Sequence, residues 1–183
     1  EPAQLEALQT YDKEIVETAG ASPERIWIAG CAPGEEAYSI AILFCEAMGG
    51  IEEAVNRELK IFASDIDEHA LSVARTGRYP AKALDDLPEE FGERYFDVED
   101  ELITVHPDLK RLILFSYHNV VQDPPFISLD LICCRNLLIY FGPILQDKAL
   151  SNFHYALREH GSLFLGTTES ASVSDDLFES TKS

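Results

Sequence analysis

The chain has 183 residues, of which 46% are hydrophobic and 10% aromatic, so it is long enough for one domain with a full core and too apolar to be disordered. Its 33 acidic residues against 14 basic ones give a formal net charge of −19, which argues against nucleic acid and against an anionic membrane surface as partners. We find no apolar run of about 18 residues and no basic-then-apolar leader, so we expect neither membrane insertion nor a signal peptide.

The cysteines indicate no metal and no disulfide framework. Cys31, Cys45, Cys133 and Cys134 each lie in apolar sequence. The last two are adjacent and cannot readily pair with each other, and neither the cysteines nor the five histidines show the spacing of metal ligands. We therefore expect reduced thiols in a cytoplasmic protein.

The amino-terminal segment predicts a helix, because Leu5, Leu8, Ile15 and Val16 fall on roughly one of its faces. A short apolar run, Ile26–Ala29, then predicts a buried parallel strand.

A turn rich in glycine follows this strand. It begins at Gly30, Pro33 biases Ala32 towards an extended backbone, and Gly34 lets the chain approach a ligand closely. A helix is expected over Glu35–Met48. Strand, glycine turn and helix in this order predict a nucleotide-type cradle.

Two carboxylates, Glu35 and Glu36, occupy the start of that helix, where unpaired N–H groups usually bind an anion. They would repel a phosphate but could accept hydrogen bonds from hydroxyls or pair with a cation. A cationic cofactor that carries a ribose is therefore favoured over a pyrophosphate. The alternative is that both carboxylates only cap the helix and complement its dipole.

A second strand, Leu59–Ser64, leads into the motif A-S-D-I-D. Asp65 comes one helix and one strand after the glycine turn, somewhat beyond the roughly 20-residue spacing of the dinucleotide fingerprint, and is the expected ribose acceptor. An acid at this place can also be only a helix cap. Asp67 is the expected N-cap of a helix Glu68–Arg75 that ends at Gly77.

The segment 78–110 interrupts the alternation of strands and helices. Pro80, Pro88 and Gly92 break it, and the short run Leu102–Val105 resembles a strand. We expect an inserted excursion, either a small binding subdomain or a long connection, within one domain over residues 1–183.

The remaining chain predicts further strands and one long helix. The strands are expected at Leu112–Phe115, Leu129–Cys133 and Ser162–Gly166, and the helix from Pro143 to about Arg158, ended by Gly161. The chain is therefore expected to be α/β, with an open, mostly parallel, Rossmann-like sheet and helices on both faces. Ligands of such sheets lie at the carboxyl ends of the strands. The polar clusters follow these ends: Gly30–Glu36, Asp65, His118–Asn119, Arg135–Tyr140 and Thr168–Ser170.

One combination of motifs extends from about Arg25 to Phe178. It comprises A-G-C-A-P-G-E-E-A-Y-S, A-S-D-I-D, G-R-Y at 77–79, R-Y-F at 94–96, H-N at 118–119, C-R-N-L-L-I-Y-F at 134–141 and T-E-S at 168–170. This combination resembles the CheR family of chemoreceptor glutamate methyltransferases. A generic methyltransferase shares the first glycine turn and the ribose acid, but not G-E-E-x-Y-S and C-R-N-x-x-I-Y-F.

The resemblance implies a Rossmann-like fold that uses S-adenosylmethionine, methylates glutamate side chains of a chemoreceptor or related signalling protein, and releases S-adenosylhomocysteine. It places the cofactor at turn and strand-end residues: Ala29, Gly34, Glu35, Asp65, Asn119, Val120, Arg135 and Asn136. Asp65 is expected on the ribose, and Asn119 and Val120 beside the adenine.

The resemblance also places Arg135 and Tyr140 close to the methionine end and the transferred methyl group, which makes them candidates for the reacting centre. From the residues alone, Tyr140 would be interpreted as a buried aromatic and Arg135 as part of a structural ion pair.

Three departures from the family pattern accompany the resemblance. Pro33 stands where the family usually has Ser or Thr, so one hydroxyl contact to the cofactor is lost. The family's amino-terminal helical domain has no counterpart before Glu1, and the last strand of its seven-stranded sheet is expected after Ser183. We expect a trimmed fragment or a catalytic module of a larger signalling protein, and the motifs resemble especially CheR-like domains fused to methylesterase and sensor domains.

Two alternatives remain at this stage. A regulatory module could bind S-adenosylmethionine or S-adenosylhomocysteine without transferring methyl, which the loss at Pro33 favours. A small-molecule methyltransferase is the other, and the block C-R-N-L-L-I-Y-F argues against it.

Overall fold

A computed structural model describes residues 25–84, 89–166, 169 and 177–179. The helix expected around residues 5–16, and Pro88, Thr168 and Ser170, lie outside the described residues.

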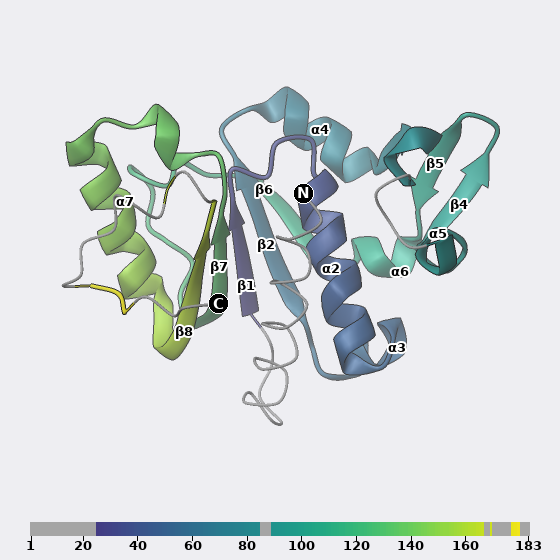
Figure 1. The fold of residues 1–183 in the computed structure, drawn as a ribbon, viewed down its shortest axis with the longest axis horizontal. Helices are drawn as coiled ribbons and strands as arrows, with labels where there is room; N and C mark the ends of the chain where they lie inside the picture. Colours follow the sequence, from purple (N-terminus) through teal and green to yellow (C-terminus); the bar gives the residue numbers. More distant parts are fainter. Residues whose placement is uncertain (1–24, 85–88, 167–168, 170–176, 180–183) are drawn as a thin grey trace.

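A parallel sheet forms the centre of the molecule (Figure 1). Its strands are β1 (Arg25–Ala29), β2 (Lys60–Asp65), β6 (Ile113–Tyr117), β7 (Leu129–Cys134) and β8 (Leu157–Leu165). They lie in the order β6-β2-β1-β7-β8, and every neighbouring pair is parallel. The expected open α/β sheet is confirmed. The strand order reverses direction between β1 and β7, and ligands of such sheets bind at this switch point.

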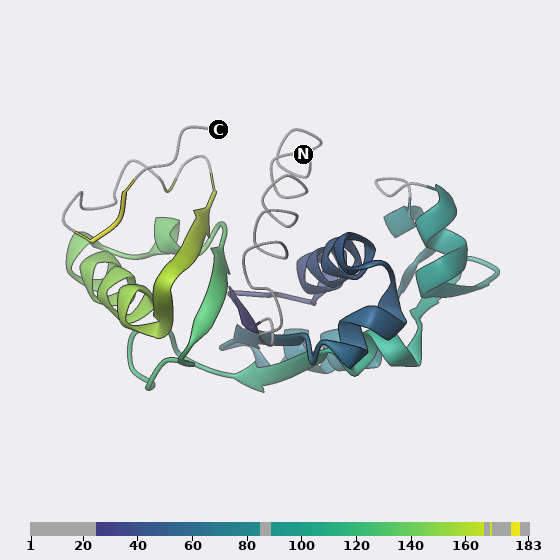
Figure 2. The ribbon, with the colours of Figure 1, turned by 90° about the horizontal axis from the view of Figure 1, so that it is seen from below.

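Helices cover both faces of the sheet because side chains alternate along each strand. Ile26 and Ile28 of β1 join the core beneath α2 (Glu35–Met48) and α4 (Glu68–Thr76), while Trp27 and Ala29 join the core beneath α7 (Pro143–Ala156). Figure 2 shows α2 and α7 on opposite sides of the twisted sheet.

Helix α2 has the expected bounds and is buried on most sides, as its apolar sequence predicts. The acidic stretch after it also forms a helix, α3 (Ile51–Asn56), which the sequence did not reveal because Ala54 is its one buried residue.

The inserted segment contains a second sheet. Its elements are β3 (Arg78–Pro80), η1 (Ala81–Leu84), α5 (Glu89–Tyr95), β4 (Phe96–Glu99), β5 (Leu102–Val105) and α6 (Pro107–Lys110). The three strands are antiparallel in the order β3-β5-β4 and lie beyond α2, away from β7 and β8 (Figure 1). Buried side chains of this segment, including Tyr79 and Ile103, belong to the same core as α2. The second sheet therefore packs on the main domain without a separate core.

The expected end of the last helix was wrong. Helix α7 stops at Ala156, and β8 begins at once with Leu157 paired to Leu129. Gly161 lies inside β8, where the register with β7 shifts, and a Cβ atom there would be 2.8 Å from the Leu129 carbonyl oxygen. The glycine permits close approach of two strands and does not terminate a helix.

No helix in the described part of the chain is long and apolar enough to cross a membrane.

Candidate functional site

The turn after β1 is fixed by hydrogen bonds to β2. The N–H groups of Gly30 and Cys31 both donate to the Ser64 carbonyl, at 2.8 and 2.9 Å. Ala32 has a φ of 49° and is left-handed, so the extended backbone expected before Pro33 was wrong. Its N–H donates to Asp65 Oδ2 at 2.9 Å, and this bond accompanies the unusual backbone.

Gly34 has a φ of 92° and precedes the first residue of α2. A Cβ atom at this position would lie 2.7 Å from the Cβ atom of Ala74 in α4. Both the left-handed backbone and the close contact require glycine. The structure thus gives Gly34 a packing reason, whereas the sequence had suggested only a ligand.

Asp65 lies at the carboxyl end of β2 and faces the turn. Each of its oxygens accepts one backbone hydrogen bond, Oδ2 from Ala32 and Oδ1 from Asp67 at 3.0 Å. An ionised carboxylate has about four acceptor positions, so each oxygen keeps capacity for one more donor. Asp67 is the N-cap of α4, as predicted, and accepts from the N–H groups of His69 and Ala70.

An ion pair joins the start of α2 to the end of β7. Arg135 Nη1 lies 3.3 Å from Glu36 Oε1, and the two side chains are 25% and 26% exposed. Burial raises the pKa of Glu36 above its ordinary value of 4.5, against the lowering effect of Arg135, and the nearby charge of Glu169 adds to the rise. Glu35 is exposed. Glu36 therefore takes part in the electrostatics of the site, whereas the Glu35 side chain lies at the surface.

The residues expected beside the adenine follow β6, next to β2 in the sheet. The Asn119 side chain shapes this loop, because its Oδ1 accepts from the N–H groups of Val121 and Gln122. Val120 is buried in the core beneath α7. The loop is thus preformed at the same sheet edge as Asp65.

Glu169, within the polar cluster Thr168–Ser170, has a structural role that the sequence did not indicate. It is 2% exposed and accepts four backbone hydrogen bonds of 2.8–3.0 Å, from Asn136, Leu137, Leu138 and Gly166. It therefore joins the loop after β7 to the end of β8. This acid belongs to the motif T-E-S, and the sequence pattern alone indicates no role for it. An acidic residue four positions after an apolar strand, among small polar residues, was the available signal.

Tyr140 ends the short 3-10 helix η2 (Leu138–Tyr140) and is 78% exposed. Its interpretation as a buried aromatic was therefore wrong. Arg135 does form the ion pair that the residues alone suggested. The structure brings Arg135, Glu36 and Glu169 together and presents Tyr140 at the adjoining surface.

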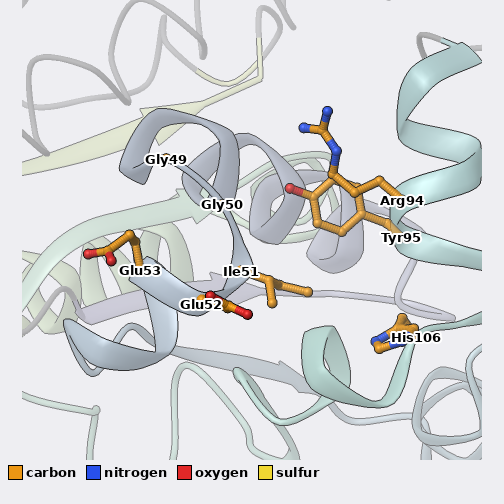
Figure 3. A pocket seen from close by; sticks show the side chains of 8 residues that line it. All are labelled: Gly49, Gly50, Ile51, Glu52, Glu53, Arg94, Tyr95 and His106. Carbon is orange, nitrogen blue, oxygen red and sulfur yellow. The ribbon is translucent and has the colours of Figure 1, made fainter.

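A pocket of about 400 Å³ lies elsewhere, beside the α2–α3 turn (Figure 3). Gly49 and Gly50 line it from one side and Arg94, Tyr95 and His106 from the other. It is at the opposite end of α2 from the glycine turn. Within the described ranges, no three His, Cys, Asp or Glu side chains are grouped so as to hold a metal ion.

Comparisons with known proteins show the family to which the chain belongs. The family model for the CheR methyltransferase SAM-binding domain matches residues 1–183. An uncharacterized 104.1 kDa protein of Rhodobacter capsulatus is 42% identical over 93% of this chain and 18% of its own length. Chemotaxis protein methyltransferase 2 of Pseudomonas aeruginosa is 37% identical over 80% of this chain and 53% of its own.

The CcbJ methyltransferase of Streptomyces caelestis shares the fold alone, with a TM-score of 0.50 and 14% identity over 84% of this chain and 49% of its own. The chain spans about half the length of the Pseudomonas aeruginosa relative and a smaller part of the Rhodobacter capsulatus one. Because the family model covers the whole sequence, the chain belongs to the CheR methyltransferase family and is its S-adenosylmethionine-binding domain.

Proposed function

We propose that this domain transfers the methyl group of S-adenosylmethionine to glutamate side chains of a cytoplasmic chemoreceptor segment or a related signalling protein. The observation that carries the proposal is the meeting of the glycine turn, Asp65 and the Glu36–Arg135 pair at one edge of a parallel sheet. The family match and the relative named as a chemotaxis methyltransferase support the reaction and the substrate class.

The residues at this edge fit S-adenosylmethionine. Asp65 has remaining acceptor capacity for the two ribose hydroxyls, and the exposed side chain of Ile66 beside it offers an apolar surface for the adenine. We assign Asn119 and Val120 to the adenine side. Ala29, Gly34 and Glu35 form the cradle, in which Glu35 contributes negative charge rather than a phosphate site.

Arg135 and Tyr140 form the proposed reacting centre, and Asn136 beside them is assigned to the cofactor. The bound cofactor supplies a methyl group on a positively charged sulfur. The substrate glutamate, with a reference pKa of about 4.3, is already an ionised nucleophile at neutral pH and needs no general base. The residues therefore contribute position and exclusion of water. Arg135 offers a cation held by Glu36, and Tyr140 an exposed hydroxyl to an incoming carboxylate.

We further propose that the domain works as a module of a larger signalling protein, with methylesterase or sensor domains attached. The relative from Rhodobacter capsulatus supports a larger assembly, because this chain matches only 18% of its length.

Methyl transfer to a receptor segment tests the proposal. Labelled methyl groups are followed onto the segment and onto a version whose acceptor glutamates are replaced by alanine. We expect transfer to the first only, and a fall of about tenfold or more in kcat for Tyr140→Phe and Arg135→Ala. Tyr155→Phe is the matched control, because Tyr155 is 74% exposed on α7.

Full transfer rates in both variants would refute the assigned roles. Binding of the cofactor without transfer to any acceptor would instead favour a regulatory module, and transfer to small molecules alone would favour a small-molecule methyltransferase.

A further inference from the structure

The inserted segment contacts the glycine turn directly through Tyr79. This residue of β3 is 5% exposed, and its hydroxyl donates to the Pro33 carbonyl oxygen at 2.7 Å. Its ring lies edge-on to that of Tyr38 in α2, with centroids 6.1 Å apart. Tyr79 belongs to the motif G-R-Y, which has no role in the proposed cofactor site or in the proposed reacting centre.

The Pro33 carbonyl is a sensitive point of the turn. Pro33 has no N–H, so this oxygen is the one hydrogen-bonding group that its backbone offers. It lies between two left-handed residues, Ala32 and Gly34, with φ angles of 49° and 92°. Such backbone persists only where its surroundings hold it. The Tyr79 hydroxyl therefore fixes the peptide plane that leads into α2.

Tyr79 is itself held by the second sheet. It pairs with Ile103 of β5, and its backbone therefore moves with β3. Burial raises the pKa of Tyr79 far above its ordinary value, helped by Tyr38 and by Glu35 at the start of α2. The hydroxyl thus stays protonated and remains a donor at any physiological pH.

A second tyrosine of the segment donates a hydrogen bond near the other end of α2, to a side-chain carboxylate. The hydroxyl of Tyr95 donates to Glu46 Oε1, and the same oxygen accepts a hydrogen bond from Arg94 Nη1. Figure 3 shows Arg94 and Tyr95 side by side at the pocket. At a rise of 1.5 Å per residue, Glu46 is roughly 18 Å along the helix from Gly34. The inserted segment is therefore bonded both to the turn that precedes α2 and to the last part of α2, and among its described residues the Tyr79 hydroxyl is the group that bonds to the turn.

We propose that Tyr79 is a positioning residue for the cofactor turn, and that through it the inserted three-stranded sheet forms part of the S-adenosylmethionine site. The proposal rests on the proposed function of that turn. Cofactor affinity is then tied to the docking of the inserted sheet on α2, and not only to residues at the carboxyl edge of the main sheet.

Tyr79→Phe and its matched control Tyr95→Phe test this proposal. Each removes one buried hydroxyl that joins the segment to α2 or to the turn before it. Tm is expected to fall by about 2–4 °C for Tyr79→Phe and by about 3–12 °C for Tyr95→Phe, because Tyr95 donates to a carboxylate. The Kd for S-adenosylhomocysteine, measured by calorimetry, is expected to rise about three- to tenfold for Tyr79→Phe and to stay unchanged for Tyr95→Phe. Amide exchange at Gly34 should quicken in Tyr79→Phe alone.

An unchanged Kd in Tyr79→Phe would overturn the proposal, as would an equal rise in both variants, since that would report general loosening of the segment. If the unaltered chain bound neither S-adenosylmethionine nor S-adenosylhomocysteine, the proposed function itself would fail, and this result is distinguishable from the other two.

Discussion

Replacing Glu169 by Gln tests the structural basis of the region around the reacting centre. In the folded chain, Oε1 of Glu169 accepts from Leu137 and Leu138, and Oε2 accepts from Asn136 and Gly166. A glutamine keeps one acceptor oxygen. Its side-chain NH₂ group would take the place of Oε2 and face the N–H groups of Asn136 and Gly166, which now donate to that oxygen.

The expected cost follows from these two bonds. A hydrogen bond to a charged group contributes about 1.5–3 kcal/mol, so two lost bonds cost about 3–6 kcal/mol. The neutral amide is cheaper to bury than the carboxylate, which favours the lower end. We therefore expect Glu169→Gln to lower the free energy of unfolding by about 3 kcal/mol, a large part of the 5–15 kcal/mol typical of a domain.

Urea unfolding followed by circular dichroism measures this loss, and amide exchange at Asn136, Leu137 and Leu138 locates it. Glu159→Gln, an exposed change on β8, is the control and should alter stability by no more than about 0.5 kcal/mol. A loss below about 1 kcal/mol in Glu169→Gln, with unchanged exchange in the loop, would refute the reasoning.

Two further changes test the turn and the ion pair. Gly34→Ala adds a Cβ atom 2.7 Å from that of Ala74 at a φ of 92° and should cost about 3 kcal/mol in urea unfolding; the added change Ala74→Gly should recover the steric part, and a neutral single variant would contradict the packing. Burial raises the pKa of Glu36 from 4.5, so the folded chain holds this proton more tightly than the unfolded chain. Glu36 therefore adds to the free energy of unfolding at acidic pH. This contribution is lost as the pH rises from about 4.5 through the raised pKa of Glu36 in the folded chain. The wild type should therefore lose stability relative to Glu36→Gln over that range, whereas a difference independent of pH would show that Glu36 is not perturbed.

Much of the fold could be predicted because its signals are local. The apolar run of α2 and the glycines that follow it fixed the helix bounds, and Asp67 was recognisable as an N-cap from its position before α4. The unpredicted features depend on contacts between distant residues. Gly161 terminates no helix because β8 pairs with Leu129, far away in the sequence. Ala32 is left-handed, and its N–H donates to Asp65 at the end of another strand.

The candidate site shows the same division. Asp65 could be named because it ends an apolar strand, and the parallel sheet brings such positions to one edge. Arg135 follows a strand as well, but its assignment to the site depended on the family resemblance. The exposure of Tyr140 and the four hydrogen bonds of Glu169 could not be predicted from the sequence, because both depend on how the loop after β7 meets the end of β8. The hydrogen bond between Tyr79 and Pro33 joins the three-stranded sheet to the turn after β1 of the main sheet, and no periodic pattern of apolar residues predicts such a contact.

The measurement that tests the central claim most directly is a calorimetric titration of the chain with S-adenosylmethionine and S-adenosylhomocysteine, repeated with Asp65→Ala and Asp67→Ala. Asp67 is the matched control, because it caps α4 two residues away and its loss should cost about 0.5–2 kcal/mol of stability only. We predict one binding site for either ligand, affinity at least about tenfold weaker in Asp65→Ala, and unchanged affinity in Asp67→Ala. Absence of binding to the unaltered chain, or equal affinity in Asp65→Ala, would contradict the assignment of this sheet edge as the cofactor site.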